Sequence, residues 1–152
     1  MKFCNHEYSR QITDQNILRR YVLGGRGVVT LLNPESKIQH TYTFRRPDDA
    51  SPYPNDILFV YAVHNNSKLF YVGIVESGSF RLTRNSRFIS DTPIVRGARY
   101  IMRLISDAHV FNTTQMQIYH EGVCAICGRP LTGEHSLEEG VGPKCINRTM
   151  IS

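Results

Sequence analysis

The chain has 152 residues, a formal net charge of +5 and four cysteines. This length suits one compact unit with a single core, which needs no disulfide bonds. No run of about eighteen apolar residues predicts a membrane span, and no apolar stretch follows Met1 to suggest a signal peptide. We therefore expect a cytoplasmic protein in which the cysteines stay reduced.

The first third of the chain predicts a helix followed by a β-hairpin. Residues 13–23 have apolar side chains at helical spacing, Thr13 suits the N-cap, and Gly24 with Gly25 ends the helix. Residues 27–33 and 39–45 are rich in β-branched and aromatic side chains, and they flank turn-forming residues. These two segments therefore predict paired strands.

The middle of the chain predicts the centre of a sheet. Residues 46–55 hold three prolines and predict a loop. Residues 57–63 and 69–75 are apolar at both alternating positions, so we expect two central strands with both faces covered. Phe80 and Leu82 alternate with arginine, which is typical of an edge strand.

A second helix and a last strand follow. Asp91, Thr92 and Pro93 form a strong helix start, and apolar residues then recur at helical spacing as far as Ile105. Residues 113–119 alternate as a strand would. The predicted fold is α+β, with an antiparallel sheet of about five to six strands and two helices. A core over residues 1–119 would carry a packed zinc-binding tail over residues 120–152, in one compact unit.

Positive charge is concentrated between residues 77 and 106. This segment holds six arginines and one aspartate, so its charge of +5 equals that of the whole chain. Three of the arginines fall close together on the second helix without acids one turn away. They either solvate the helix or bind a polyanion, and Phe80, Phe88 or Tyr100 would then stack on unpaired bases. The predicted binding residues are Arg81, Arg84, Arg87, Arg96, Arg99, Arg103 and Tyr100.

Three cysteines near the C-terminus predict a zinc knuckle. Cys124 and Cys127 have C-x2-C spacing, and Cys145 follows after seventeen residues. Thiolates in this arrangement suit a tetrahedral zinc ion, and Gly128 supplies the left-handed backbone that often closes such a turn. We expect a knuckle of treble-clef or zinc-ribbon type.

The spacing leaves the fourth zinc ligand open among three alternatives. His120 precedes Cys124 by four residues and is the first choice. His135 lies between the cysteine pair and Cys145, and is the second. The third is Cys4 with His6, which would require the N-terminus to pack against the tail.

We expect the zinc site to be closed and structural rather than catalytic. A deaminase places glutamate two residues after its histidine ligand and its paired cysteines far downstream. Here Gly122 occupies the glutamate position and the cysteine pair follows at once. Because the chain also lacks a nucleophile elbow, a phosphate loop and an H-E-x-x-H motif, we predict that it is not an enzyme.

The tail reads H-E-G-V-C-A-I-C-G-R-P-L-T over residues 120–132 and S-L-E-E-G-V-G-P-K-C over residues 136–145. It resembles a family of small phage and mobile-element proteins that end in a zinc-binding domain of unassigned function. Weaker similarity extends over most of the chain. The resemblance implies a protein of the host cytoplasm, and it favours His120, Cys124, Cys127 and Cys145 as ligands.

Two functions remain open. The first is non-enzymatic binding of nucleic acid or a nucleoprotein through the arginine-rich surface. The second is an anti-defence role, in which the protein inhibits a host complex such as a CRISPR or restriction nuclease. The basic charge argues only against an inhibitor that mimics DNA.

Overall fold

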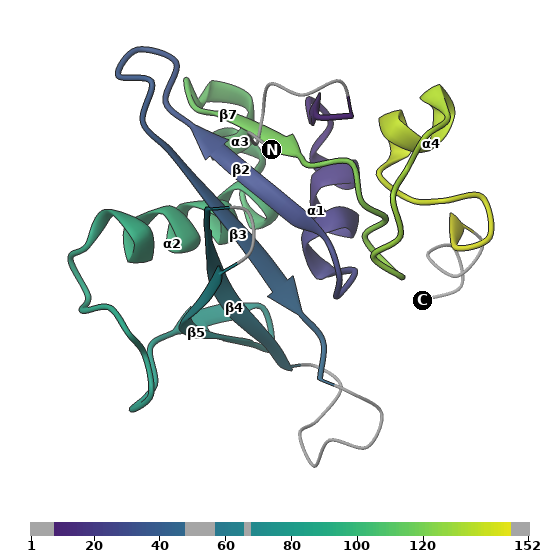
Figure 1. The fold of residues 1–152 in the computed structure, drawn as a ribbon. Helices are drawn as coiled ribbons and strands as arrows, with labels where there is room; N and C mark the ends of the chain where they lie inside the picture. Colours follow the sequence, from purple (N-terminus) through teal and green to yellow (C-terminus); the bar gives the residue numbers. More distant parts are fainter. Residues whose placement is uncertain (1–7, 48–56, 66–67, 147–152) are drawn as a thin grey trace.

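The computed structural model describes residues 8–47, 57–65 and 68–146. They form an α+β fold with one antiparallel sheet of seven strands in the order β1-β7-β2-β3-β4-β5-β6 (Figure 1). The α+β class and the antiparallel sheet confirm the prediction, whereas the numbers of strands and helices exceed it. The strands are β1 Arg10–Gln11, β2 Val28–Leu32, β3 Gln39–Arg45, β4 Ile57–His64, β5 Lys68–Glu76, β6 Ser79–Arg81 and β7 Gln117–His120. The helices are α1 Gln15–Leu23, α2 Pro93–Ser106, α3 Ala108–Thr113 and α4 Glu134–Glu139.

Helix α1 begins one residue later than predicted. Asp14, rather than Thr13, occupies the N-cap, and its carboxylate accepts a hydrogen bond from the Ile17 N–H at 3.0 Å. Helix α2 begins at Pro93 as predicted. Thr92 holds its N-cap position, but the Thr92 hydroxyl donates to the Ile89 carbonyl instead of capping the helix.

The hairpins β2–β3 and β4–β5 and the edge strand β6 agree with the predictions, but the sheet order does not. Strand β3 is central, so the two most apolar strands lie toward the β6 edge. Leu58, Val60 and Ala62 on β4 belong to the main core, which also contains residues of α1 and α2. On the opposite face of β4, Phe59 and Tyr61 remain partly exposed. The expectation that both faces are fully covered was therefore wrong for these side chains.

Helix α3 occupies residues that the sequence pattern did not mark as helical. Asp107 caps it by accepting hydrogen bonds from the N–H groups of His109 and Val110. Thr113, predicted to open the last strand, instead ends this helix, and strand β7 begins at Gln117. Capping by Asp107 explains why the chain re-enters a helix directly after α2.

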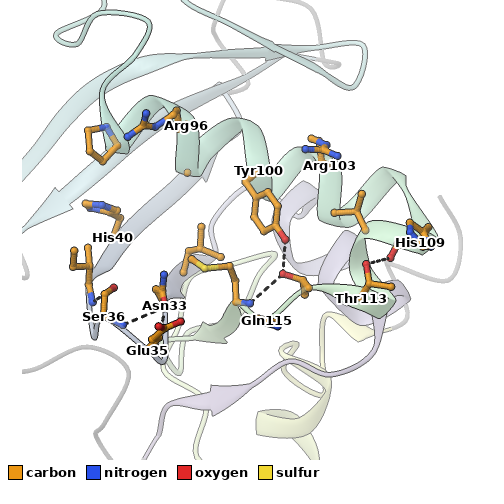
Figure 2. Close-up of a pocket in the computed structure, with 17 residues that line it drawn as sticks. Asn33, Glu35, Ser36, His40, Arg96, Tyr100, Arg103, His109, Thr113 and Gln115 are labelled. Carbon is orange, nitrogen blue, oxygen red and sulfur yellow. Dashed lines mark hydrogen bonds between the residues drawn. The ribbon is translucent and has the colours of Figure 1, made fainter.

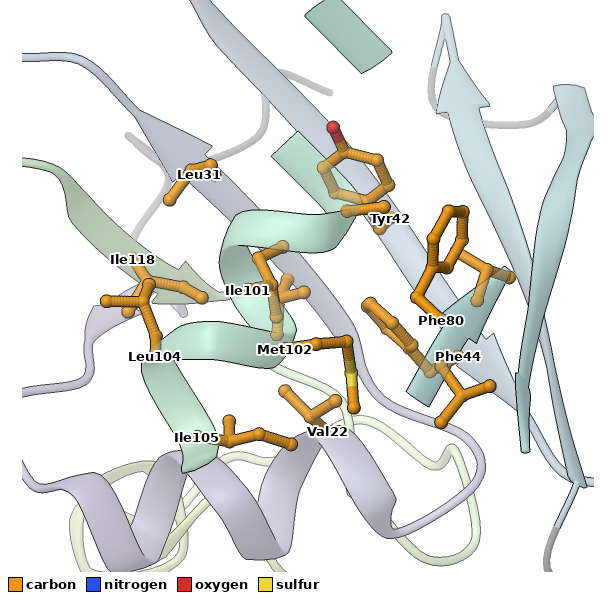
Figure 3. Packing of buried hydrophobic residues seen from close by; sticks show 14 of the residues in the cluster. Val22, Leu31, Tyr42, Phe44, Phe80, Ile101, Met102, Leu104, Ile105 and Ile118 are labelled. Carbon is orange, nitrogen blue, oxygen red and sulfur yellow. The ribbon is translucent and has the colours of Figure 1, made fainter. Parts of the chain in front are cut away.

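The main core lies between the sheet and helices α1 and α2 (Figure 3). Close approach of α2 to the sheet depends on Gly97. A Cβ atom at this position would lie 2.2 Å from the Tyr42 hydroxyl oxygen, and that hydroxyl donates to the Ile94 carbonyl at 2.7 Å.

None of the helices in the described part of the chain is long and apolar enough to cross a membrane.

Tyr21 joins helix α1 to the sheet and to the C-terminal tail. Its hydroxyl donates to the Val123 carbonyl at 2.7 Å and accepts from the Val28 N–H at 3.2 Å. Its ring stacks on His120, with ring centres 5.2 Å apart. Burial raises the pKa of this hydroxyl, so it remains a donor at every ordinary pH.

Two hydrophobic clusters lie on either side of this junction. The smaller one belongs to the tail and contains Cys124, Leu131, Leu137, Val141 and Cys145. Ala125, from the same tail, belongs to the main core instead. The tail therefore has its own apolar centre and also contributes to the core of the sheet.

We expect Tyr21→Phe to lower the free energy of unfolding by about 2 kcal/mol, because Val123 and Val28 would each keep a partly buried backbone group without its partner. Urea denaturation would measure the change. Tyr119→Phe is the matched control, since within the described part of the chain the Tyr119 hydroxyl bonds only to the Gln117 side chain, in a partly exposed setting. Equal losses in the two variants would contradict the bridging role of Tyr21.

Candidate metal centre and arginine surface

The C-x2-C segment forms a tight turn. The Cys124 N–H donates to the Arg129 carbonyl at 2.8 Å, and the Gly128 N–H donates back to the Cys124 carbonyl at 2.9 Å. Gly128 has a φ of 78°, the left-handed conformation expected of it. This turn directs the Cys124 and Cys127 side chains to one side of the loop, as the sequence pattern predicted.

Helix α4 and the turn after it bring Cys145 to the other two cysteines. The helix ends at Gly140, whose φ of 72° reverses the chain. The Cys145 N–H then donates to the Gly142 carbonyl at 3.0 Å, which closes a second turn. Leu137 anchors the helix in the smaller hydrophobic cluster.

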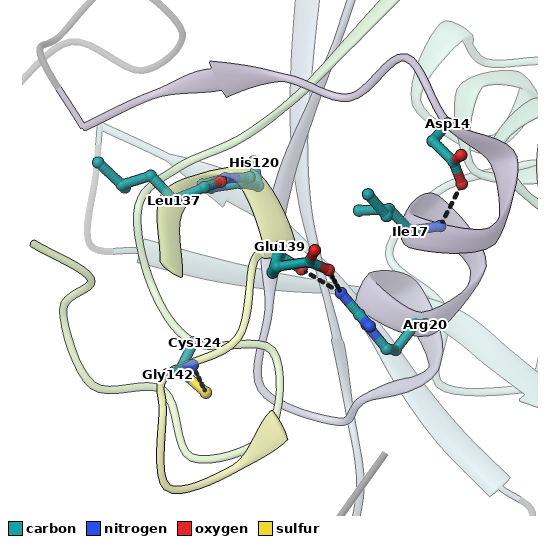
Figure 4. A network of polar contacts seen from close by, with 8 residues as sticks. All are labelled: Asp14, Ile17, Arg20, His120, Cys124, Leu137, Glu139 and Gly142. Carbon is teal, nitrogen blue, oxygen red and sulfur yellow. Dashed lines mark hydrogen bonds and ion pairs between the residues drawn. The ribbon is translucent and has the colours of Figure 1, made fainter. Parts of the chain in front are cut away.

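The three sulfur atoms lie within 4.8 Å of one another. Zinc bound tetrahedrally at a Zn–S distance of about 2.3 Å would need sulfurs about 3.8 Å apart, so the spacing suits a bound metal. Two backbone N–H groups, from Ile126 and Gly142, each donate to the Cys124 sulfur at 3.4 Å. Figure 4 shows the bond from Gly142. The group thus combines soft donors with the outer hydrogen bonds typical of a metal site.

The pKa values of the two buried thiols, Cys124 and Cys145, are shifted in opposite directions. Burial raises the pKa of Cys124, but hydrogen bonds from the N–H groups of Gly142, Cys127 and Ile126 outweigh it, and the pKa is lowered overall. Burial raises the pKa of Cys145 to about 11, aided by its hydrogen bond to Cys127 and by the charge of Cys124. A cation would compensate for three thiolates so close together.

His120 has another role in this structure. Its Nδ1 accepts a hydrogen bond from the Gly122 N–H at 3.0 Å, so the proton resides on Nε2, which donates to the Leu137 carbonyl. That carbonyl belongs to the last turn of α4, where no partner exists within the helix. A metal ligand must offer a free lone pair. The geometry therefore does not support the prediction that His120 is the fourth ligand.

The other candidates for the fourth position do not join the group either. His135 is exposed on α4, and the cluster of possible ligands in the described residues contains only the three cysteines. Cys4 and His6 lie outside the described residues. Three positions of a tetrahedral site are thus assigned within the part of the chain that the structure describes.

The tail is fixed to helix α1 by an ion pair as well as by Tyr21. One Arg20 nitrogen, Nη2, donates to the Glu139 carboxylate at 2.6 Å and to the Glu139 carbonyl at 2.7 Å (Figure 4). Both side chains are partly buried, at 25% and 30% exposure. Nothing in the sequence pattern indicated this pair, because the two residues are far apart in the chain.

The predicted arginine surface divides into two regions. Arg96, Tyr100 and Arg103 line a groove beside α2. Arg81 and Arg87 line a separate hollow on the sheet, where Arg81 pairs with Glu76 at 3.2 Å.

The remaining predicted residues lie apart from both regions. Arg84 is exposed and lines neither. The Arg99 guanidinium carbon lies 5.2 Å from the centre of the Phe80 ring. Phe80 is only 8% exposed, so the expectation that its ring is open to a base was wrong.

Part of the tail matches a known family model. The model is described as a family of unknown function (DUF6011), and it matches residues 115–148. No curated protein matches the chain, and no solved structure matches it. The match agrees with the predicted resemblance to a family of unassigned function. It covers strand β7, the three clustered cysteines and α4.

We expect His120→Leu to leave metal stoichiometry unchanged while it lowers the free energy of unfolding by about 2 kcal/mol, because two buried backbone groups lose their partner. Metal analysis and urea denaturation would measure the two effects. His135→Leu is the control for an exposed histidine. If His120→Leu instead alters the visible spectrum of the cobalt-loaded protein, His120 is a ligand and the hydrogen-bonding role is contradicted.

Proposed function

We propose that the three-cysteine site binds zinc and stabilises the tail. The donor set supports this assignment, since thiolates favour zinc over the hard cations that prefer oxygen ligands. The cysteines line a hollow that also contains Arg129, Thr132, Ser136 and Lys144. Its described lining includes no carboxylate or histidine that would serve as a general base, which supports a structural rather than a catalytic role.

Cys127→Ser tests the structural role of zinc most cleanly, because Cys127 is exposed and its side chain contributes little packing. We expect one zinc per chain in the reduced protein, loss of zinc in the variant, and a fall of at least about 2 kcal/mol in unfolding free energy. Elemental analysis and urea denaturation measure these outcomes. Cys4→Ser is the comparison, and zinc loss there would identify Cys4 as the fourth ligand. Zinc-free wild-type protein of full stability would contradict the proposal.

We further propose that the protein binds nucleic acid, with the groove beside α2 as an anchoring site. The groove has a volume of about 900 Å³ and lies between α2, the β2–β3 turn and the segment from His109 to Met116 (Figure 2). The single observation that carries the proposal is that two arginines, with no partner among the described residues, share its wall with an aromatic ring. These residues are Arg96, Arg103 and Tyr100.

The charges in this groove are available to a ligand. Among the described residues, neither Arg96 nor Arg103 forms an ion pair or a hydrogen bond through its guanidinium group, and both are exposed. Seven residues of helix separate them by about 10 Å along the helix axis. Glu35 is the one acidic residue among the described residues that line the groove. The groove therefore suits phosphates more than it suits a neutral partner.

The Tyr100 ring is held in place between the two arginines. Its hydroxyl shares a short hydrogen bond with the Thr114 hydroxyl, and the Met116 N–H also donates to that Thr114 oxygen at 3.1 Å. These bonds fix the α2 side of the groove to the segment that leads into β7. A ligand would thus meet a ring held by hydrogen bonds and two exposed cations.

We expect the double variant Arg96→Gln/Arg103→Gln to bind oligonucleotides at least about tenfold more weakly at low salt. The slope of log affinity against log salt should fall by about two, since each lost phosphate contact lowers it by about one. Fluorescence polarisation across a salt series measures both quantities. Arg129→Gln/Lys144→Gln removes two exposed charges beside the metal centre and is the matched control. Absence of binding by the wild-type protein would contradict the proposal and favour the inhibitor hypothesis.

A further inference from the structure

A second hollow lies on the sheet face opposite the main core. It has a volume of about 580 Å³ and is lined by residues of β4, β5, β6 and the segment that follows β6. Its described lining combines aromatic and aliphatic side chains, two arginines and small polar side chains, and includes no acidic residue. The residues that matter here are Tyr61, Tyr71, Arg81, Thr83, Asn85 and Arg87.

Tyr61 and Tyr71 form the aromatic floor of this hollow. They are paired across β4 and β5, and their ring centres lie 5.8 Å apart in an edge-to-face arrangement. The register of the two strands shifts between Val60 and Tyr61, so the floor sits at a β-bulge. Bulges often redirect side chains at binding sites. Both rings remain partly exposed, although apolar strands normally bury such large groups.

The segment from Thr83 to Arg87 forms one wall of the hollow and is hydrogen-bonded to Tyr71. The Tyr71 hydroxyl shares a hydrogen bond of 2.8 Å with the Thr83 hydroxyl, and the Arg87 N–H donates to the Tyr71 carbonyl at 3.0 Å. Between these anchors, the Ser86 hydroxyl accepts from the Thr83 N–H at 2.9 Å, which closes a tight turn. The segment that carries Arg87 is therefore fixed to the aromatic floor at both ends.

The Arg87 side chain packs on an aromatic ring, and its charge has no acidic partner among the described residues. Its guanidinium carbon lies 5.6 Å from the centre of the Phe70 ring, which leaves the donors in the guanidinium plane unpaired among the described residues. Arg81, the second cation, pairs with Glu76 in an exposed setting, where such a pair contributes little. The hollow thus has Arg87, whose guanidinium packs on Phe70, in the same lining as the Tyr61 and Tyr71 rings.

We propose that this hollow binds one nucleotide of a single strand, with the base stacked on Tyr61 or Tyr71 and the adjacent phosphate on Arg87. This inference rests on the proposed nucleic-acid function and specifies its substrate, because only an unpaired base exposes a face for stacking. The two arginines, and the absence of acids from the part of the lining that the structure describes, match a phosphate-bearing ligand. Arg96 and Arg103 would hold phosphates at the separate groove.

Paired variants test the hollow separately from the groove. We expect Tyr61→Ala and Arg87→Gln each to weaken binding of a short oligothymidylate about tenfold, with affinity for a duplex of equal length unchanged. Tyr61→Phe retains the ring and should bind as the wild type does. Arg84→Gln removes an exposed charge that does not line the hollow, and it should have little effect. Fluorescence polarisation gives the affinities, and thermal melting checks that each variant is folded.

A titration with thymidine monophosphate, followed by nuclear magnetic resonance, separates the two proposals. Shifts of the Tyr61 and Tyr71 ring signals support the hollow, even if the Arg96→Gln/Arg103→Gln variant binds normally and the groove fails. Shifts confined to Tyr100 would retain the groove and overturn the hollow. Equal loss of duplex and single-strand binding in Arg87→Gln would also overturn it, because the residue would then act as a general phosphate contact.

Discussion

The buried hydroxyl of Tyr21 is the interaction on which the arrangement of the tail depends. It bonds to Val123 just before the cysteine pair and to Val28 at the start of strand β2, while its ring packs on His120. A buried hydroxyl must keep its partners, so helix α1, the sheet and the tail hold one another in a single arrangement. The Arg20–Glu139 ion pair reinforces the same junction one residue earlier in α1.

The tail at this junction has a structural role, whereas the proposed binding sites lie on other parts of the molecule. The cysteines complete the tail, whose small apolar cluster is built around Cys124, Leu137 and Cys145. Zinc would compensate for the three thiolates and supply folding free energy that so small a cluster lacks. The unpaired arginines of α2 and the aromatic hollow lie on other elements. Under our proposals, the metal stabilises the tail, and nucleic acid binds at the groove beside α2 and at the hollow on the sheet.

Local signals predicted most of the fold, and contacts distant in sequence accounted for the failures. The hairpins, the Pro93 helix start and the cysteine turn follow from spacing and turn chemistry. His120 stays a predicted ligand, chosen from its spacing to Cys124 and from the resemblance. Its contact with the Leu137 carbonyl becomes visible only when α4 is placed. The partly exposed rings of Tyr61 and Tyr71 lie on two strands, β4 and β5, that were expected to be covered on both faces. Likewise, helical spacing grouped Arg99 with Arg96, yet Arg99 turns toward Phe80.

The most direct test of this division of roles is ultraviolet cross-linking of the zinc-loaded protein to a single-stranded oligonucleotide, with the attached peptides identified by mass spectrometry. The account predicts attachment at Tyr61 or Tyr71 on the sheet hollow and at Tyr100 beside α2. Attachment concentrated in residues 120–146 would contradict it, because the metal-bearing tail would then be the nucleic-acid interface.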